Sequence, residues 1–250
     1  MSKVIIQKIK KEPVVRFNGN LIFLPTKLQR EINKYWKKCL DSGKEYFNGE
    51  LYMVTQIKET SQNSEIIVQK TNFAHWLYAR NTINDLGKYN LVTVFSSGLV
   101  ITKDNKIVFG KMGEQASTAR KYQLSGGGLN DDDLQEDIFD MKYSIERELI
   151  EELGLNINDK SRVQGCEVAY LKTGGNGNVA IIYEIKLNET AEEFLKKYND
   201  FAEKLKEKNE TPEFSEIVIL PNEKIEIEKF INQNKDKMAN YLPGVLRQVM

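Results

Sequence analysis

The stretch of sequence that decides the fold is Arg147–Leu155, which reads RELIEELGL. At about 100° per residue, a helix through this stretch places the carboxylates of Glu148 and Glu152 one above the other, with Glu151 on their flank. Gly154 is typical of a residue that ends a helix. The sequence therefore predicts a helix that gathers three carboxylates along one side.

The apolar residues around this stretch predict that the same side faces the protein core. Ile138, Met141, Ile145 and Leu149 fall on nearly the same arc as Glu152, and we expect the helix to run from about 138 to 153. Glutamates four residues apart repel each other, and a buried carboxylate is unfavourable unless it is paired. A divalent cation would supply the missing positive charge, and oxygen ligands suit Mg²⁺ or Mn²⁺.

A glycine run, Gly126–Gly128, precedes this helix. Together with Arg147–Leu155 it resembles the signature motif of the Nudix hydrolases, which ends in the pattern Arg-Glu-apolar-any-Glu-Glu-any-Gly-apolar. Two features depart from the motif. Phe139 stands where the family has a glutamate, and the segment between the glycines and the helix is longer than usual and acidic.

The resemblance implies the Nudix fold, an α/β/α sandwich around a mixed sheet, for residues 89–250. Residues 1–88 contain short alternating strands and a helix that begins at about Thr26, a plausible N-cap. We expect them to form a small, strand-rich α+β region. The polar segment Asn81–Asn90 is the predicted boundary between the two parts.

The family pattern also implies roles for individual residues. Glu148, Glu151, Glu152 and the carbonyl of Gly126 would hold the metal, which neutralises phosphates and acidifies a bound water. Glu151 and Glu152 are therefore catalytic candidates for the hydrolysis of a pyrophosphate. Arg147 is expected to orient a glutamate rather than to touch the substrate.

Two further roles have two candidates each. The missing glutamate would pair with Arg147, and either Asp140, seven residues before the arginine, or Glu136 could replace it. A later loop would supply a general base or a further ligand, either Glu213 or Glu216. We favour Glu213, because it stands farther from the strand that follows.

Composition excludes several other functions. Lys and Arg number 36, as do Asp and Glu, so the 250-residue chain has no overall basic charge for nucleic acid. No stretch approaches the length of a membrane-spanning helix. Cys39 and Cys166 lie far apart, as expected of reduced thiols in a cytoplasmic protein. The single histidine, His75, lies in an aromatic patch and is expected to be structural, which argues against histidine-based triads.

A looser resemblance concerns the substrate. Phe17–Leu21, Tyr46–Tyr52 and Leu91–Gly110 together resemble the Nudix branch that hydrolyses UDP-sugars. This implies a small-molecule substrate, a nucleoside diphosphate linked to another group, with UDP-sugar cleaved to UMP and sugar 1-phosphate as the first expectation. The alternative is a non-catalytic Nudix-fold module that binds a nucleotide or a partner, which Phe139 and the acidic segment favour. The base, the leaving group and the oligomeric state stay open.

Overall fold

The computed structural model describes residues 3–44, 46–59, 64–82, 86–114, 119–175 and 178–249. Part of the predicted boundary segment, residues 83–85, lies outside these ranges. No helix in the described ranges is long and apolar enough to cross a membrane.

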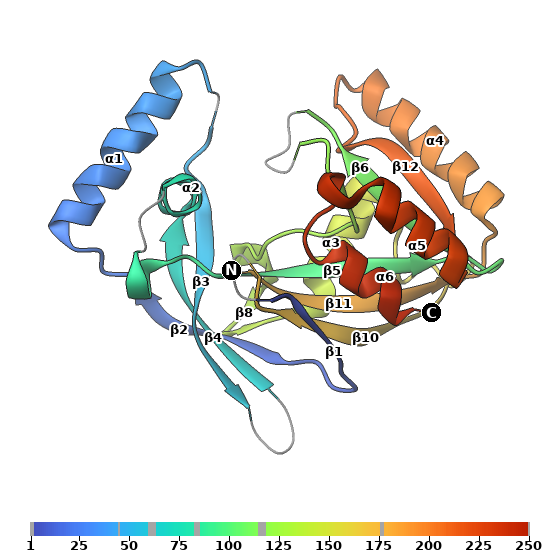
Figure 1. Ribbon diagram of the computed structural model, residues 1–250, viewed down its shortest axis with the longest axis horizontal. Helices are drawn as coiled ribbons and strands as arrows, with labels where there is room; N and C mark the ends of the chain where they lie inside the picture. The colour runs from blue at the N-terminus through green and yellow to red at the C-terminus, as the bar shows by residue number, and fades with distance from the viewer. Residues whose placement is uncertain are drawn as a thin grey trace.

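A mixed β-sheet forms the centre of the larger half of the molecule (Figure 1). Strands β5 and β11 are parallel, and their other neighbours are antiparallel. The end of β5 also pairs with β6, which pairs in turn with β7 and β12. The strands are β1 (Ile5–Lys8), β10 (Val163–Thr173), β11 (Asn178–Leu187), β5 (Thr93–Ile101), β6 (Lys106–Met112), β7 (Tyr122–Gln123) and β12 (Phe214–Pro221).

Helices cover both faces of this sheet, because successive side chains of a strand point to opposite sides. Val94 and Val100 of β5 join the core with helices α3 (Met141–Leu153) and α4 (Ala191–Glu207). Leu99 and Ile101 of the same strand join the core with α5 (Lys224–Gln233) and α6 (Leu242–Gln248). The predicted α/β/α sandwich is therefore confirmed.

The smaller half, which we call the N-terminal lobe, runs from β2 to α2 and lies beside the sandwich in Figure 1. Its strands are ordered β3-β4-β2, and Met53 of β3 pairs with Thr93 of β5. Helix α1 follows Pro25 as the N-cap, so Thr26 is its first helical residue and not the predicted cap. The elements are β2 (Val14–Leu21), α1 (Thr26–Asp41), β3 (Glu50–Glu59), β4 (Ser64–Asn72), α2 (Phe73–Asn81) and the 3₁₀ turn η1 (Gly87–Tyr89).

The acidic segment before α3 belongs structurally to the N-terminal lobe. It forms the 3₁₀ turn η2 (Asp131–Asp133) and a hairpin of β8 (Leu134–Gln135) and β9 (Ile138–Phe139), and β9 pairs with β2. The division of the chain near residue 88 stays a prediction. Strands on either side of it pair with each other, because β1 pairs with β10 and β2 pairs with β9.

In this hairpin Phe139 is part of the core. The side chain is 2% exposed and lies edge-on to the ring of Tyr52 in β3, with ring centroids 4.6 Å apart. It also corrects the predicted start of the helix. Ile138 is in a strand and is 40% exposed, so it does not belong to the core-facing arc, and α3 begins only at Met141.

Candidate active site

Helix α3 carries two of its carboxylates, those of Glu148 and Glu152, on the buried side. Ile145 and Leu149 are fully buried, and Glu148 and Glu152 are only 8% and 2% exposed. The helix ends at Gly154, which has the left-handed conformation at φ +60° and donates its N–H to the carbonyl of Ile150.

The glycine loop, Ser125–Gly128, packs between β5 and α3. The N–H of Ser96 donates to the carbonyl of Gly127 at 3.1 Å. A Cβ on Gly127 would lie 2.3 Å from Oε1 of Glu148, and a Cβ on Gly126, at φ +146°, would lie 2.2 Å from the Ser96 carbonyl oxygen. Gly126 therefore requires glycine, because its backbone lies directly against β5, whereas a side chain at Gly127 would displace the carboxylate of Glu148.

Gly126 lies where its two backbone polar groups can serve the site. Its N–H donates to Oε2 of Glu152 at 2.9 Å. The carbonyls on either side, of Ser125 and Gly127, accept N–H groups of β5, whereas the Gly126 carbonyl accepts no hydrogen bond from any described residue. That carbonyl is thus available for the ligand role that the family pattern implies.

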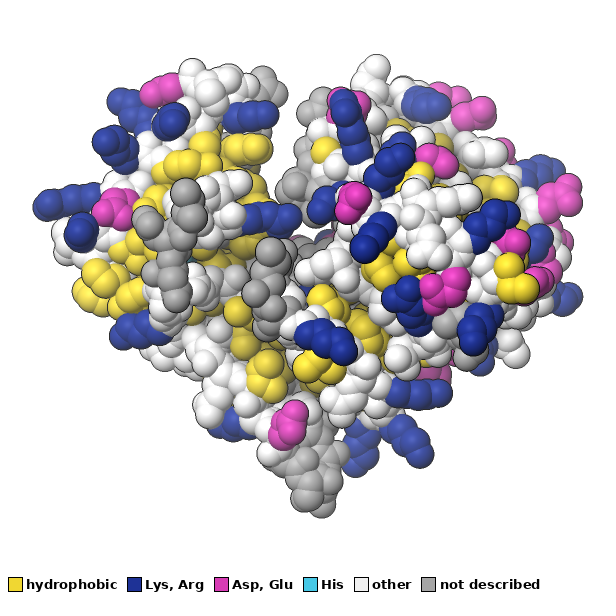
Figure 2. Space-filling model, viewed as in Figure 1, with side chains coloured by type: hydrophobic (Ala, Val, Ile, Leu, Met, Phe, Trp, Pro, Cys, Tyr) yellow, Lys and Arg dark blue, Asp and Glu magenta, His cyan; other side chains and the backbone are white. Residues whose placement is uncertain are grey.

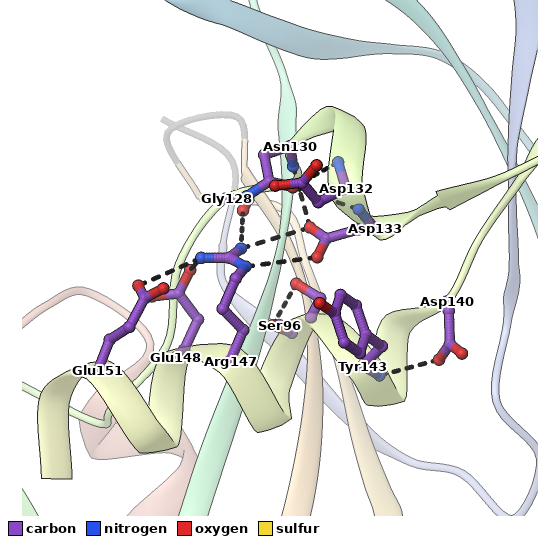
Figure 3. A network of polar contacts seen from close by, with 11 residues as sticks. Ser96, Gly128, Asn130, Asp132, Asp133, Asp140, Tyr143, Arg147, Glu148 and Glu151 are labelled. Carbon is purple, nitrogen blue, oxygen red and sulfur yellow. Dashed lines mark hydrogen bonds and ion pairs between the residues drawn. The ribbon is translucent and has the colours of Figure 1, made fainter. Parts of the chain in front are cut away.

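Arg147 is held by acidic groups on two sides (Figure 3). On α3 its guanidinium lies 2.7 Å from Glu148 and 3.4 Å from Glu151. On the other side it contacts both carboxylate oxygens of Asp133, at 3.4 and 3.5 Å, and the carbonyl of Gly128 at 3.4 Å. The arginine therefore joins the helix to the acidic segment and to the glycine loop.

Both expected partners of Arg147 were wrong. Asp140 instead caps the start of α3, where its carboxylate accepts the N–H of Tyr143 at 2.8 Å. Glu136 lies in the tight turn between β8 and β9, at φ +56°. Neither side chain is bonded to the arginine.

Asp133 is fully buried, and reciprocal hydrogen bonds with Asn130 hold it in place. Its carboxylate accepts the backbone N–H of Asn130 at 2.9 Å, while the Asn130 side chain accepts the N–H groups of Asp132 and Asp133. Such a reciprocal cap has a sequence signature, a capping residue followed three positions later by an acid. Asn130 and Asp133 show that spacing, and it is the signal that could have identified Asp133.

The late loop brings Glu213 to the helix and leaves Glu216 outside. Glu213 immediately precedes β12, lines the same cleft as the glycine loop, and interacts with Glu152. Glu216 is within β12, is exposed, and lies 3.9 Å from Lys111 on the neighbouring strand. The geometry thus favours Glu213 of the two candidates.

Burial and mutual repulsion make this carboxylate cluster electrostatically unfavourable. Burial raises the pKa of Glu148 to about 7, against the opposing effect of Arg147. Burial, and then repulsion from Glu213, raises the pKa of Glu152 well above its usual value. Burial also raises the pKa of Glu213 itself, although part of its side chain is exposed. A cation would relieve all three effects.

The carboxylates do not already enclose a metal position. Among the described residues no three Asp, Glu, His or Cys side chains form a ready ligand cluster. Glu148 is drawn toward Arg147, and Glu151 is 58% exposed and turned toward the same guanidinium. The hard oxygen donors suit Mg²⁺ or Mn²⁺, and small rotations of the glutamate side chains would be needed to converge on one.

The site opens into a cleft of about 910 Å³ between the two halves, visible as the central recess in Figure 2. The glycine loop and Glu213 lie on its sandwich side. The N-terminal lobe contributes aromatic side chains, Tyr52, Phe73 and Trp76. Ligand pockets typically measure roughly 300–1,000 Å³, so the cleft can hold a molecule the size of a nucleotide derivative.

The single histidine is hydrogen-bonded within the N-terminal part of the chain. The ring of His75 is fully buried, with Nδ1 2.8 Å from the Thr71 hydroxyl and Nε2 3.0 Å from the Tyr89 carbonyl. Both Cys39 and Cys166 are free thiols.

The sequence matches no protein-family model and no curated protein. Solved structures do resemble it. DR0079 of Deinococcus radiodurans is 11% identical, with a TM-score of 0.46 over 80% of this chain and 99% of its own. A NUDIX hydrolase of Nitrosomonas europaea is 12% identical, with a TM-score of 0.37 over 63% and 86%.

A third similar structure is a bifunctional NMN adenylyltransferase/ADP ribose pyrophosphatase of Francisella tularensis, solved with AMP and a manganese ion. It is 14% identical, with a TM-score of 0.37 over 63% of this chain and 42% of its own. The proteins that this chain resembles in structure thus include members of the Nudix family, whose motif is also the one that Arg147–Leu155 resembles.

Proposed function

We propose that the protein is a Nudix-type, metal-dependent pyrophosphohydrolase that cleaves a nucleoside diphosphate linked to another group. The observation that carries the proposal is a group of three carboxylates, Glu148, Glu152 and Glu213, each of which is unfavourable without a cation. Glu213 lines the cleft, and the buried carboxylate of Glu152 accepts the N–H of Gly126 and interacts with Glu213.

Glu148, Glu151, Glu152 and the carbonyl of Gly126 would hold Mg²⁺ or Mn²⁺. When bound, the cation neutralises phosphate charge and lowers the pKa of a coordinated water. Hydrolysis of a phosphoanhydride depends mainly on such charge stabilisation and on a positioned water.

The chain's own residues supply the positioning and the proton transfer. Arg147 fixes α3 against η2 through Asp133 and against the glycine loop through the carbonyl of Gly128, so the helix keeps its place when a charged substrate enters. The carboxylate of Glu213 takes the proton from the attacking water. The N–H of Gly126 holds Glu152 by its Oε2 atom.

The substrate we propose first is a UDP-sugar, cleaved to UMP and a sugar 1-phosphate. The loose sequence resemblance to the UDP-sugar-hydrolysing branch supports it, and the cleft volume is compatible with it. The test is turnover by purified protein with Mg²⁺ or Mn²⁺ on UDP-glucose, ADP-ribose, NADH, coenzyme A and nucleoside triphosphates. Products are separated by ion-exchange chromatography, with the Glu152→Gln variant as the control for contaminating hydrolases.

A non-catalytic nucleotide-binding module is the second candidate. The lack of a ready ligand cluster among the described carboxylates favours it, as does Phe139 at the family's glutamate position. Metal binding without turnover of any panel substrate would count against the hydrolase. Binding of UDP-glucose that persists without hydrolysis in both metals would favour the module.

A further inference from the structure

A buried lysine lies on the sandwich side of the cleft. Lys172, near the end of β10, is 1% exposed and yet lines the cleft that also contains Glu213 and the glycine loop. Its Nζ donates to the carbonyl of Asn178 at 2.5 Å. No described carboxylate lies within ion-pair distance of it.

Such a group is costly to bury for structural reasons alone. Burial lowers the pKa of Lys172 to about 8, because no neighbouring charge compensates for the lost water. An ammonium has three N–H donors and no acceptor, and among the described residues the carbonyl of Asn178 accepts one of them. An apolar side chain of similar length would fill the same space without an uncompensated charge.

The sheet register places Lys172 in line with the proposed site. Lys172 pairs with Ala180 of β11, Ala180 pairs with Phe95 of β5, and Phe95 forms a bridge to Gly128 of the glycine loop. Neighbouring strands are about 4.8 Å apart, so the backbone of Lys172 is roughly 10 Å from Phe95 and 15 Å from the loop. A nucleoside diphosphate has a length of this order.

The ring of Phe95 offers a surface for a flat group between the two ends. It is partly exposed at the cleft, and its centroid is 5.6 Å from that of Tyr241. A base resting on this ring would present its edge toward Lys172.

We propose that Lys172 binds an acceptor oxygen of the substrate at the end of the cleft away from the α3 carboxylates, and so selects for substrates that carry one there. The proposal rests on the proposed function for the substrate class. The oxygen belongs either to a base carbonyl, as in uracil, or to an additional phosphate on the nucleoside. An amino group at the same place is itself a hydrogen-bond donor, so it could not accept a bond from the Lys172 ammonium.

The experiment compares Lys172→Met with Lys121→Met, a matched control because Lys121 lines the same cleft but is exposed. Calorimetry without metal measures binding of UMP, AMP and adenosine 3′,5′-bisphosphate to each protein. Steady-state kinetics with Mg²⁺ compares UDP-glucose with ADP-glucose. Thermal unfolding of each variant reports the fold.

The expected result is a loss of about tenfold or more in affinity for the ligand whose oxygen Lys172 binds, because a charged donor is removed. Weaker UMP binding alone identifies the base carbonyl, with a matching rise in KM for UDP-glucose at unchanged kcat. Weaker binding of the bisphosphate alone identifies the phosphate. AMP binding should be the same in all three proteins, and Lys172→Met should melt no lower than the wild type.

Equal loss for every ligand together with a lower melting temperature would show that Lys172 only ties the strand ends together, and would overturn the proposal. Unchanged binding of every ligand would also overturn it, as would a wild type that binds none of them. Lysine-dependent binding of UMP without any turnover would defeat the proposed hydrolase and leave this inference standing. Turnover by the wild type, together with binding of every ligand that Lys172→Met leaves unchanged, would overturn this inference and leave the proposed hydrolase standing.

Discussion

Replacing Asp133 by asparagine tests whether this residue, and not Asp140, holds Arg147. Asparagine keeps the shape and an acceptor for the Asn130 N–H, so the change removes mainly the charge opposite the guanidinium. Asp133 is fully buried, and the Arg147 side chain is 18% exposed. A hydrogen bond to a charged group contributes roughly 1.5–3 kcal/mol, and Arg147 keeps Glu148 at 2.7 Å, so we expect a loss of about 2 kcal/mol.

This loss is measurable as a melting shift. For a chain of this size each kcal/mol corresponds to about 2–4 °C, so Asp133→Asn should melt roughly 4–8 °C lower than the wild type in calorimetry with EDTA present. Asp140→Asn is the matched control, because asparagine caps a helix about as well as aspartate, and it should shift the melting temperature by much less. Glu136→Gln, in an exposed turn, should be silent.

A double-mutant cycle locates the effect. In an Arg147→Met variant, Asp133 is a buried carboxylate without its cationic partner. Adding Asp133→Asn to that variant should therefore leave its melting temperature unchanged or raise it. A melting temperature of Asp133→Asn within 1 °C (about 0.3–0.5 kcal/mol) of the wild type would refute the reasoning. So would an equal loss in Asp140→Asn, or simple additivity in the cycle.

Three other predictions concern the carboxylates and the loop. Glu148→Gln and Glu152→Gln should each lower turnover on the order of 10²-fold without lowering the melting temperature, since a ligand charge and its repulsion disappear together; near-normal turnover at saturating Mg²⁺ would place the metal elsewhere. Glu213→Gln should lower kcat with little change in KM. If only Glu216→Gln lowered kcat, Glu216 and not Glu213 would be the general base. Gly127→Ala places a methyl 2.3 Å from Oε1 of Glu148 and should raise the Mg²⁺ concentration needed for half-maximal rate; an unchanged Mg²⁺ titration would contradict the packing of the loop.

Local periodicity carried the prediction of helix α3 and of its buried acids. Ile145, Leu149 and Glu152 share one arc because a helix repeats every 3.6 residues, and a property of that kind can be read from a dozen neighbouring residues. The glycine that ends the helix has an equally local cause. The same reasoning correctly placed Glu213 on a loop ahead of β12.

Non-local pairing accounts for what the sequence did not reveal. The partner of Arg147 is set by where η2 packs, and η2 is placed by a hairpin that joins β2, more than a hundred residues earlier. Ile138 fits the helical arc by sequence, because a two-residue strand has no period of its own. Lys172 has no local signal in the sequence, because only the register of β10, β11 and β5 brings it into line with the glycine loop.

The hairpin has a consequence for which side chain position 139 can hold. Asp131, two residues from the anchor of Arg147, accepts the hydroxyl of Tyr52 and lies 2.9 Å from Lys70, both of the N-terminal lobe. A glutamate in place of Phe139 would bury a carboxylate against the ring of Tyr52, with Asp133 already paired with the arginine. The buried ring of Phe139 and the ion pair of Arg147 with Asp133 therefore depend on the same hairpin.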